Sequence, residues 1–298
     1  MIFSIIATCC VSQNLGEQLG HGLVIAIRDG KKRLDRPDAL PLPPVDIEWD
    51  TQGVAEMAYI HYVRLIAMAL DNSFQDLVQT VIGDRLVGGH TSHNGIKSFM
   101  RMLNKMRSAD DHLYKPQPRP AQNVDCIRLL AAAPTWQALK ECAQIINDVF
   151  EGAVKVKNGF SMTEEEAEKM FNLRLVLISV LHSHPVHKTV GALVAAAEVQ
   201  ALWQAYAEAP APAGIPESIW HSSLDEAMRW IHHPSLKDRK VAMICEVQLA
   251  LQQTVHVRHA MHELYVSTLL GCACFLDFCV RMGGANERLS CGCGEHTG

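Results

Sequence analysis

The sequence predicts an α+β protein with a mixed β-sheet of about four to five strands and helices packed against it. Apolar residues recur at helical spacing in some segments, while other segments are short, apolar and rich in β-branched residues. The two types interleave as helix, helix, strand, helix, two strands, a helical insertion, a strand and a final helix, which favours a mixed sheet over an all-helical fold. The predicted strands are 124–133, 152–159, 171–181 and 241–251.

The first predicted helix carries one apolar stripe. Its members are Met57, Ile60, Val63, Ala67, Leu70, Phe74, Leu77 and Val81. We expect Gly83 to end this helix, and the stripe is too short for a coiled coil, so we expect it to pack in the core. A Gly/His-rich loop, 88–95, then leads into a second helix over 96–107. Thr135 is expected to cap a third helix that runs to Phe150.

Three shorter patterns predict further local structure. Val154 and Val156 alternate with Lys155 and Lys157, which indicates a half-buried strand. Residues 190–236 read as a helical insertion between two strands. Two Ser-x-x-Glu patterns are typical of capping boxes at helix starts. They are Ser161–Glu164 and, within the insertion, Ser223–Glu226.

The composition bounds the class of protein. Of 298 residues, 48% are hydrophobic and 20% are charged, which is close to the average for globular proteins and excludes wholesale disorder. The net charge of −5 argues against bulk nucleic-acid binding. No apolar run reaches the roughly 18 residues that span a bilayer, so we expect no membrane partner and a cytoplasmic location. We divide the chain into an N-terminal extension and irregular connection (1–54), an α+β domain (55–270) and a Cys/Gly-rich tail (271–298).

The cysteines and histidines leave alternatives open. Three cysteines lie in apolar segments and are expected to be buried thiols, whereas five in the tail could bind a soft metal or remain free thiols. A metal-binding regulatory protein is therefore a third functional hypothesis, after the two given below. The tail residues are Cys272, Cys274, Cys279, Cys291 and Cys293; the histidine groups that could also bind metal are His182, His184 and His187, and His256, His259 and His262.

Two carboxylates are candidates for a cation site. Glu246 lies in the middle of an apolar strand, on the same face as Gln248, and a carboxylate there is costly unless it is paired or solvated. Asp125 opens the first predicted strand. Carboxylates from neighbouring strands could hold Mg²⁺ against phosphate oxygens. The alternatives are an outward-facing Glu246 and an Asp125 that serves only as a turn or cap residue.

Basic residues could form a phosphate-binding surface in this otherwise acidic chain. Lys97, Arg101 and Lys105 are spaced four apart, on one helix face, and Lys155 and Lys157 share a strand face. Arg128 and Arg174 complete the set, and guanidinium groups match phosphate geometry well. The alternative is that these are ordinary solvated charges.

In this order, the elements resemble the RelA/SpoT-type family of (p)ppGpp synthetase-like nucleotidyltransferases. The resemblance covers 88–265 and rests on five pieces that occur in the family's order. The pieces are Ile96-Lys97-Ser98 with Arg101 and Lys105; Asp125-Cys126-Ile127-Arg128; Val154-Lys155-Val156-Lys157-Asn158; Phe171-Asn172-Leu173-Arg174; and Cys245-Glu246-Val247-Gln248-Leu249, followed by His262-Glu263-Leu264-Tyr265.

The resemblance implies a chemistry and a set of site residues. In that family pyrophosphate passes from ATP to the 3′-hydroxyl of GDP or GTP, so it implies a purine nucleotide as partner, with ATP or GTP as substrate. Asp125 and Glu246 would hold Mg²⁺, with Gln248 beside them at the catalytic centre. The phosphate contacts would be Lys97, Arg101, Lys105, Lys155 and Lys157.

The sequence also departs from the family pattern. The family's synthetases carry a Gly-Tyr motif whose tyrosine stacks on the acceptor guanine, whereas Asn172 and Leu173 stand at that place here, and Leu175 replaces an acid. The insertion also lies near the expected site. The alternative function is therefore a catalytically inactive RelA/SpoT-like fold that binds a protein or RNA partner.

Overall fold

The computed structural model confirms the α+β class. It describes residues 53–93, 95–115, 118–169 and 174–255, and those up to Gln252 belong to one compact unit. Expectations for the N-terminal extension, for Asn172 and Leu173, for the final helix and for the cysteine tail with its neighbouring histidines lie outside the described residues.

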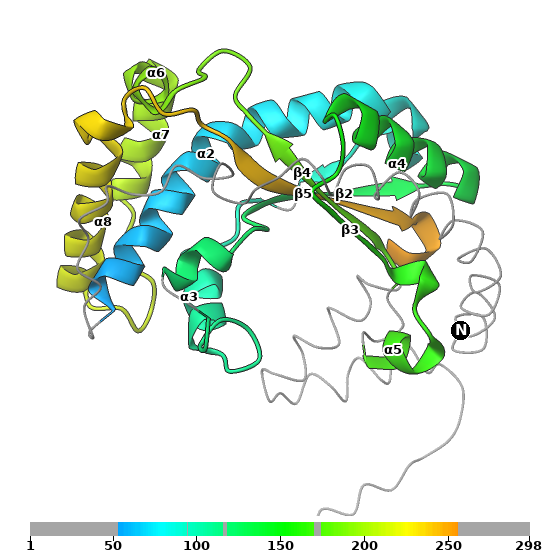
Figure 1. Ribbon diagram of the computed structural model, residues 1–298, viewed down its shortest axis with the longest axis horizontal. Helices are drawn as coiled ribbons and strands as arrows, with labels where there is room; N and C mark the ends of the chain where they lie inside the picture. Colours follow the sequence, from blue (N-terminus) through cyan, green and yellow to red (C-terminus); the bar gives the residue numbers. More distant parts are fainter. Residues whose placement is uncertain (1–52, 94, 116–117, 170–173, 256–298) are drawn as a thin grey trace, which may run out of the picture. The chain divides into compact units, whose positions relative to one another are not determined.

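Among the described residues, the sheet has five strands in the order β1-β2-β5-β4-β3 (Figure 1). Strands β2 and β5 are parallel, and the other neighbours are antiparallel, so the sheet is mixed. The first strand is only two residues long and comes from the segment predicted as a loop. The bounds are β1 Ser92–His93, β2 Ile127–Ala133, β3 Lys155–Asn158, β4 Val176–His182 and β5 Met243–Leu251.

One face of the sheet forms part of the core. Leu129, Val247, Ile178 and Val156 are aligned as Cα partners across β2, β5, β4 and β3, and paired residues point to the same face. The first three are fully buried and Val156 is half-buried. The prediction that Glu246 and Gln248 share one face of β5 is confirmed by the register, because their Cα partners on β4 are Ser179 and Leu177, also two residues apart. All residues of β5 other than Glu246 are buried, so buried residues lie on both faces of this strand.

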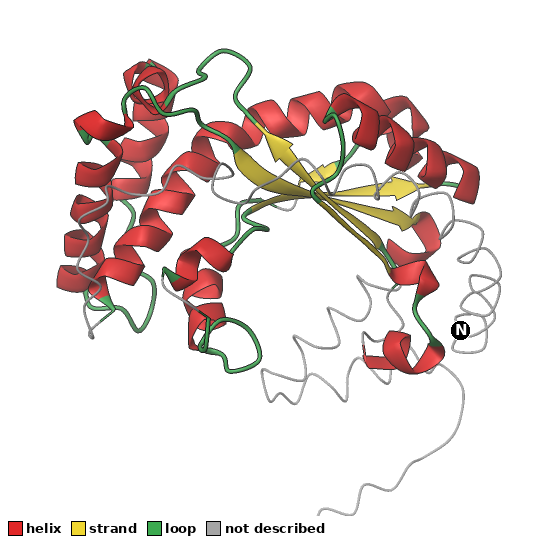
Figure 2. Cartoon of the chain, in the orientation of Figure 1, coloured by secondary structure: helices red, strands yellow, loops and turns green. Residues whose placement is uncertain are grey.

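Two long helices contribute to the same core. Helix α2 (Val54–Ile82) and helix α4 (Trp136–Val149) contact β2 and β5 and each other, and Figures 1 and 2 show both helices on one side of the sheet. The predicted cap of α4 is confirmed, because the Thr135 hydroxyl accepts a hydrogen bond from the Ala138 N–H. Helix α3 (Phe99–Arg107) begins three residues later than expected.

The insertion is helical, as predicted, and packs on α2. It contains α6 (Val190–Ala195), α7 (Ala197–Ala207) and α8 (Glu217–Ile231), and α7 and α8 both contact α2. Because α8 covers a second side of α2, residues outside the predicted stripe are also buried. The buried Trp203 donates from Nε1 to the Leu65 carbonyl at 2.8 Å, which ties α7 to α2.

The two capping-box predictions were wrong. Ser223 lies inside α8, where its hydroxyl donates to the Ile219 carbonyl, because the apolar stripe of α8 runs through it and continues to Ile231. The acidic helix α5 (Glu164–Lys169) is capped instead by a reciprocal pair, in which Glu166 accepts from the Thr163 N–H and Thr163 accepts from the Glu166 N–H. The remaining elements are 3₁₀ turns at Gly83–Arg85, Val87–Gly89, Arg119–Gln122, Gly159–Ser161 and Pro234–Leu236.

Within the described ranges, no helix combines the length and the apolar character that a membrane span requires. Cys126, Cys142 and Cys245 are buried free thiols, as the apolar segments around them predicted. Burial raises the pKa of the Cys126 thiol to about 12, so it stays protonated and acts as a small core residue.

Buried His182 makes stability depend on pH. The Ser73 hydroxyl donates to the Leu70 carbonyl, so it accepts from the His182 Nε2–H at 2.9 Å, and the ring is neutral. Burial first, then His184 and Lys188, lowers the pKa of His182 to about 4. The unfolded chain takes up this proton below about pH 6.5, so the contribution is complete above that pH and is lost as pH falls toward 4.

We expect His182 to cost about 2 kcal/mol of unfolding free energy between pH 8 and pH 5. His182→Gln supplies an amide N–H donor in place of the imidazole N–H but does not ionise in this pH range. Its free energy of unfolding, measured with urea, should therefore fall less than that of the wild type between pH 8 and pH 5. His221→Gln, on the exposed surface of α8, is the control and should follow the wild type. Parallel pH profiles for His182→Gln and the wild type would contradict the assignment.

Candidate functional site

The second face of the sheet carries a row of polar residues. Arg128, Glu246, Ser179 and Lys155 are Cα partners in turn across β2, β5, β4 and β3. This face is opposite the apolar row of Leu129, Val247 and Ile178, because neighbouring residues of a strand alternate between faces. The next row on the same side contains Gln248, Leu177 and Lys157. We call Arg128, Ser179, Glu246, Gln248, Lys155 and Lys157 the polar face.

Exposure differs along the polar face. Lys155 and Lys157 are exposed on the edge strand β3, whereas Glu246 and Arg128 are half-buried. Gln248 is buried, and its Nε2 donates to Glu246 Oε1 at 2.7 Å. This bond orients the carboxylate of Glu246 within an otherwise buried strand. The polar face thus offers a fixed acidic group between half-buried and exposed cations.

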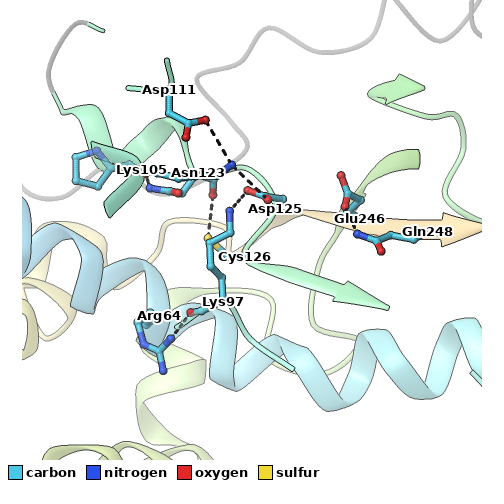
Figure 3. Close-up of polar contacts among 10 residues, drawn as sticks. Arg64, Lys97, Lys105, Asp111, Asn123, Asp125, Cys126, Glu246 and Gln248 are labelled. Atoms are coloured by element: carbon cyan, nitrogen blue, oxygen red, sulfur yellow. Dashed lines mark hydrogen bonds and ion pairs between the residues drawn. The ribbon is translucent and has the colours of Figure 1, made fainter. Parts of the chain in front are cut away.

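A second group lies at the start of β2. Asp125 lies in the turn just before β2, and its Oδ1 is paired with the ammonium of Lys97. Lys105, in the last turn of α3, has its Nζ 3.8 Å from Asp125 Oδ2 and 4.0 Å from Asp111 Oδ1. Figure 3 shows these side chains converging. We call Lys97, Lys105, Asp111 and Asp125 the Asp125 cluster.

Burial and pairing oppose each other in this cluster. The Lys97 side chain is completely buried, and burial lowers its pKa against the opposing effect of Asp125. Burial also works to raise the pKa of Asp125, but the charge and hydrogen bond of Lys97, helped by Lys105, outweigh it and the pKa falls below its usual value. Asp125 is therefore an ionised counter-ion of two lysines at neutral pH.

The backbone of Lys97 is anchored on both sides. Its N–H donates to the Cys126 carbonyl at 2.9 Å, and its carbonyl accepts from Arg64 Nη1 (Figure 3). Arg64 Nε also donates to the Tyr206 hydroxyl at 3.1 Å, and that hydroxyl lies 2.9 Å from His61 Nδ1. Since Arg64 can only donate, the Tyr206 oxygen is the acceptor of that bond. The inserted helix α7 thereby contributes to the position of Lys97.

The neutral state of His61 has a clear cause. The ring is stacked on Phe99, with centroids 4.6 Å apart, and meets the edge of Trp220 at 4.5 Å. Burial, with a smaller effect from Arg64, lowers the pKa of His61 to about 3. The His61 contacts join α2, α3 and α8 beside the Asp125 cluster.

The structure separates the remaining basic candidates. Lys97 precedes α3 and Arg101 is exposed on α3, so the three basic residues do not share one helix face as predicted; only Lys97 and Lys105 meet, at Asp125. Arg174 is buried, and its Nη1 donates to the Gly159, Phe160 and Met162 carbonyls. Those bonds hold the turn after β3 against the start of β4.

Gly159 shows how tightly that turn is packed. A Cβ at this position would lie 2.7 Å from the Leu175 carbonyl oxygen, so the close approach of the two strands requires glycine. The Gly159 N–H donates to the same oxygen at 2.7 Å. This contact fixes the end of β3, on which Lys155 and Lys157 lie.

Of the two predicted cation ligands, Glu246 lies on β5 and Asp125 lies in the turn before the neighbouring strand β2. Glu246 is the Cα partner of Arg128, which follows Asp125 by three residues, a span of roughly 10 Å in extended chain. Figure 3 shows the Asp125 cluster and the Glu246–Gln248 pair as two separate groups. As donors, two carboxylates fit a hard cation that takes further oxygens from a phosphate. As placed, however, Asp125 is already neutralised by lysines.

The histidines of the described segment do not form a metal centre. Within that segment, no three His, Cys, Asp or Glu side chains are grouped closely enough to hold a metal ion. His182 is bonded to Ser73, and His187 Nε2 lies 3.0 Å from Glu198 Oε1. His182, His184 and His187, which the sequence offered only as a possible ligand group, therefore do not form one.

Three contributing residues gave no sequence signal. Arg64 is one of several polar residues on a long, mainly apolar helix, Tyr206 belongs to the insertion, and Ser179 lies in an apolar strand. Only contacts between residues far apart in the chain reveal them. Comparisons with protein-family models, curated proteins and solved structures found no match to this chain. The geometry of the chain itself must therefore carry any functional argument.

Proposed function

We propose that this protein binds a purine nucleotide through its phosphates on the polar face of the sheet. The observation that carries this proposal is the strand register, which aligns Lys155, Ser179, Glu246 and Arg128 in one row. Cations and hydroxyl groups bind phosphate oxygens, and this row places an arginine, a hydroxyl and a lysine at strand spacing, with Glu246 between the arginine and the hydroxyl. The net charge of −5 makes such a local cationic row selective for compact anions over long nucleic acids.

The RelA/SpoT resemblance extends this proposal to a reaction. The elements that carry the resemblance and lie in the described residues occur in the expected order, with Glu246 and Gln248 on a strand beside that of Arg128. The proposed reaction is pyrophosphate or nucleotidyl transfer between purine nucleotides such as ATP and GTP. Asp125 and Glu246 would hold the Mg²⁺, which would neutralise charge on the phosphates.

The contributions of this chain to such a reaction are binding and orientation. Lys155, Lys157 and Arg128 would fix the phosphate chain, and Gln248 keeps the Glu246 carboxylate in place. Ser179 offers a neutral hydrogen-bond donor between these charges. Phosphoryl chemistry depends mainly on positioning and charge neutralisation, which these groups supply.

Removing the two edge lysines tests the proposal. We expect Lys155→Gln/Lys157→Gln to weaken binding of ATP or GTP by at least about tenfold, because each charged hydrogen bond contributes about 1.5–3 kcal/mol. Calorimetric titration with and without Mg²⁺ measures this. Lys140→Gln is the control, because Lys140 is exposed on α4, which packs on the other side of the sheet. Equal affinity in the double variant and the wild type would reject the proposed site.

A second function is supported by the state of Asp125. Asp125 is paired with Lys97 and Lys105. In a domain that binds no catalytic metal, such ion pairs would be retained because they stabilise the fold. The alternative proposal is thus a catalytically inactive RelA/SpoT-like fold that binds a protein or RNA partner. The absence of any thermal shift with ATP or GTP, with or without Mg²⁺, would favour this alternative.

A further inference from the structure

We infer that Lys97 competes with divalent cations for Asp125. In the nucleotide-free protein the ammonium of Lys97 is paired with the Asp125 carboxylate, so a divalent cation binds there only after this ion pair has broken. The inference concerns regulation of the site described above, and its relevance to nucleotide binding rests on the proposed function. Its basis is the arrangement of charges in the Asp125 cluster (Figure 3).

Both oxygens of Asp125 face a cation. Lys97 is paired with Oδ1, and Lys105 Nζ lies 3.8 Å from Oδ2. A divalent cation entering this position would meet two ammonium groups at a few ångströms, where like charges repel strongly. Metal and lysines therefore compete for the same carboxylate.

Lys97 cannot yield easily to a metal ion alone. Its side chain is fully buried, and its backbone is held by Cys126 and by Arg64. If the Lys97 ammonium moved away from Asp125 without gaining another anionic partner, its charge would remain buried and unpaired, which is costly. The pair therefore persists unless another anion accepts the lysine.

A polyphosphate is such an anion. Phosphate oxygens could take over Lys97 and Lys105, which would release Asp125, and Mg²⁺ commonly combines one or two carboxylates with substrate phosphates. Cation binding and nucleotide binding would then strengthen each other by the same factor, as linkage requires. The free protein would be insensitive to cellular divalent cations.

The test needs no nucleotide, so it is independent of the proposed function. Mn²⁺ is added to the purified full chain, and the unbound Mn²⁺ is measured by electron paramagnetic resonance. We expect the wild type to show no site that Asp125→Asn removes, whereas Lys97→Met gains a site at least tenfold tighter than any in the wild type. Lys97→Met/Asp125→Asn should lose that gained site.

Two outcomes would overturn the inference. One is a wild-type Mn²⁺ site that disappears in Asp125→Asn, because Asp125 would then be open to metal in the free protein. The other is a folded Lys97→Met variant that gains nothing, because the lysine would then not be the barrier. Lys97→Gln, which keeps a polar end at that position, replaces Lys97→Met if circular dichroism shows the latter to be unfolded.

Discussion

Asp125→Asn should lower the free energy of unfolding by about 2–4 kcal/mol. The substitution leaves the ammonium of Lys97 buried without its counter-ion, and breaking a buried ion pair from one side typically costs about 3–5 kcal/mol. We expect a value about 1 kcal/mol below that range because the Asp125 side chain is 22% exposed and water screens part of the charge. Urea denaturation followed by circular dichroism measures the effect.

The matched control removes both charges. Lys97→Met/Asp125→Asn replaces the pair by neutral groups of similar size, so it should recover much of the stability lost in Asp125→Asn alone. With Lys97→Met it completes a double-mutant cycle, which isolates the energy of the pair. If the losses of the two single variants simply add in the double variant, the pair is not coupled and the assigned role of Asp125 is wrong.

Arg119→Met should lower the free energy of unfolding by about 2–4 kcal/mol, because it breaks a buried ion pair from one side while Arg119 itself is 22% exposed. Arg119 holds the carboxylate of Glu56, which is only 4% exposed, with Nε 2.6 Å from Oε1 and Nη2 on Oε2. Without the guanidinium, the buried carboxylate of Glu56 on α2 loses its bidentate partner. The expected result is a lower urea midpoint with an unchanged slope.

The geometry of the guanidinium provides the control. Arg119→Lys keeps the charge but cannot make the two parallel hydrogen bonds, so it should rescue only part of the loss. Glu56→Gln/Arg119→Met should be more stable than Arg119→Met, because no buried charge remains. A loss below about 1 kcal/mol in Arg119→Met, the size typical of a surface pair, would contradict the buried-pair assignment.

The Arg119 side chain also supports the candidate site. Arg119 Nη1 donates to the Met106 carbonyl at 3.3 Å and to the Leu113 carbonyl at 3.5 Å, on either side of the turn that follows α3. That turn carries Asp111, which lies beside Lys105. Loss of the Arg119 contacts should therefore destabilise the Asp125 cluster as well as the core.

Patterns read over a few neighbouring residues were reliable for most of the fold. The apolar stripe of α2 as far as Phe74, the Thr135 cap and the shared face of Glu246 and Gln248 all depend on the periodicity of a single helix or strand. Burial of one face then follows from the hydrophobic effect alone. The Ser223–Glu226 pattern failed because a short capping motif does not outweigh an apolar stripe that continues through it. The Ser161–Glu164 pattern failed because Thr163 and Glu166 form the reciprocal cap of α5 instead.

The sequence by itself determined the class of the fold, the face of β5 on which Glu246 lies, and the choice of Asp125 and the lysines as candidates. Only the tertiary structure decided what those candidates do. The row from Lys155 to Arg128 exists because the chain returns after the insertion to place β5 between β2 and β4. The pairing of Lys97 with Asp125 and of Arg64 with Tyr206 joins residues 28 and 142 positions apart. Strand register and ion pairing depend on which distant segments become neighbours, and no local periodicity records that choice.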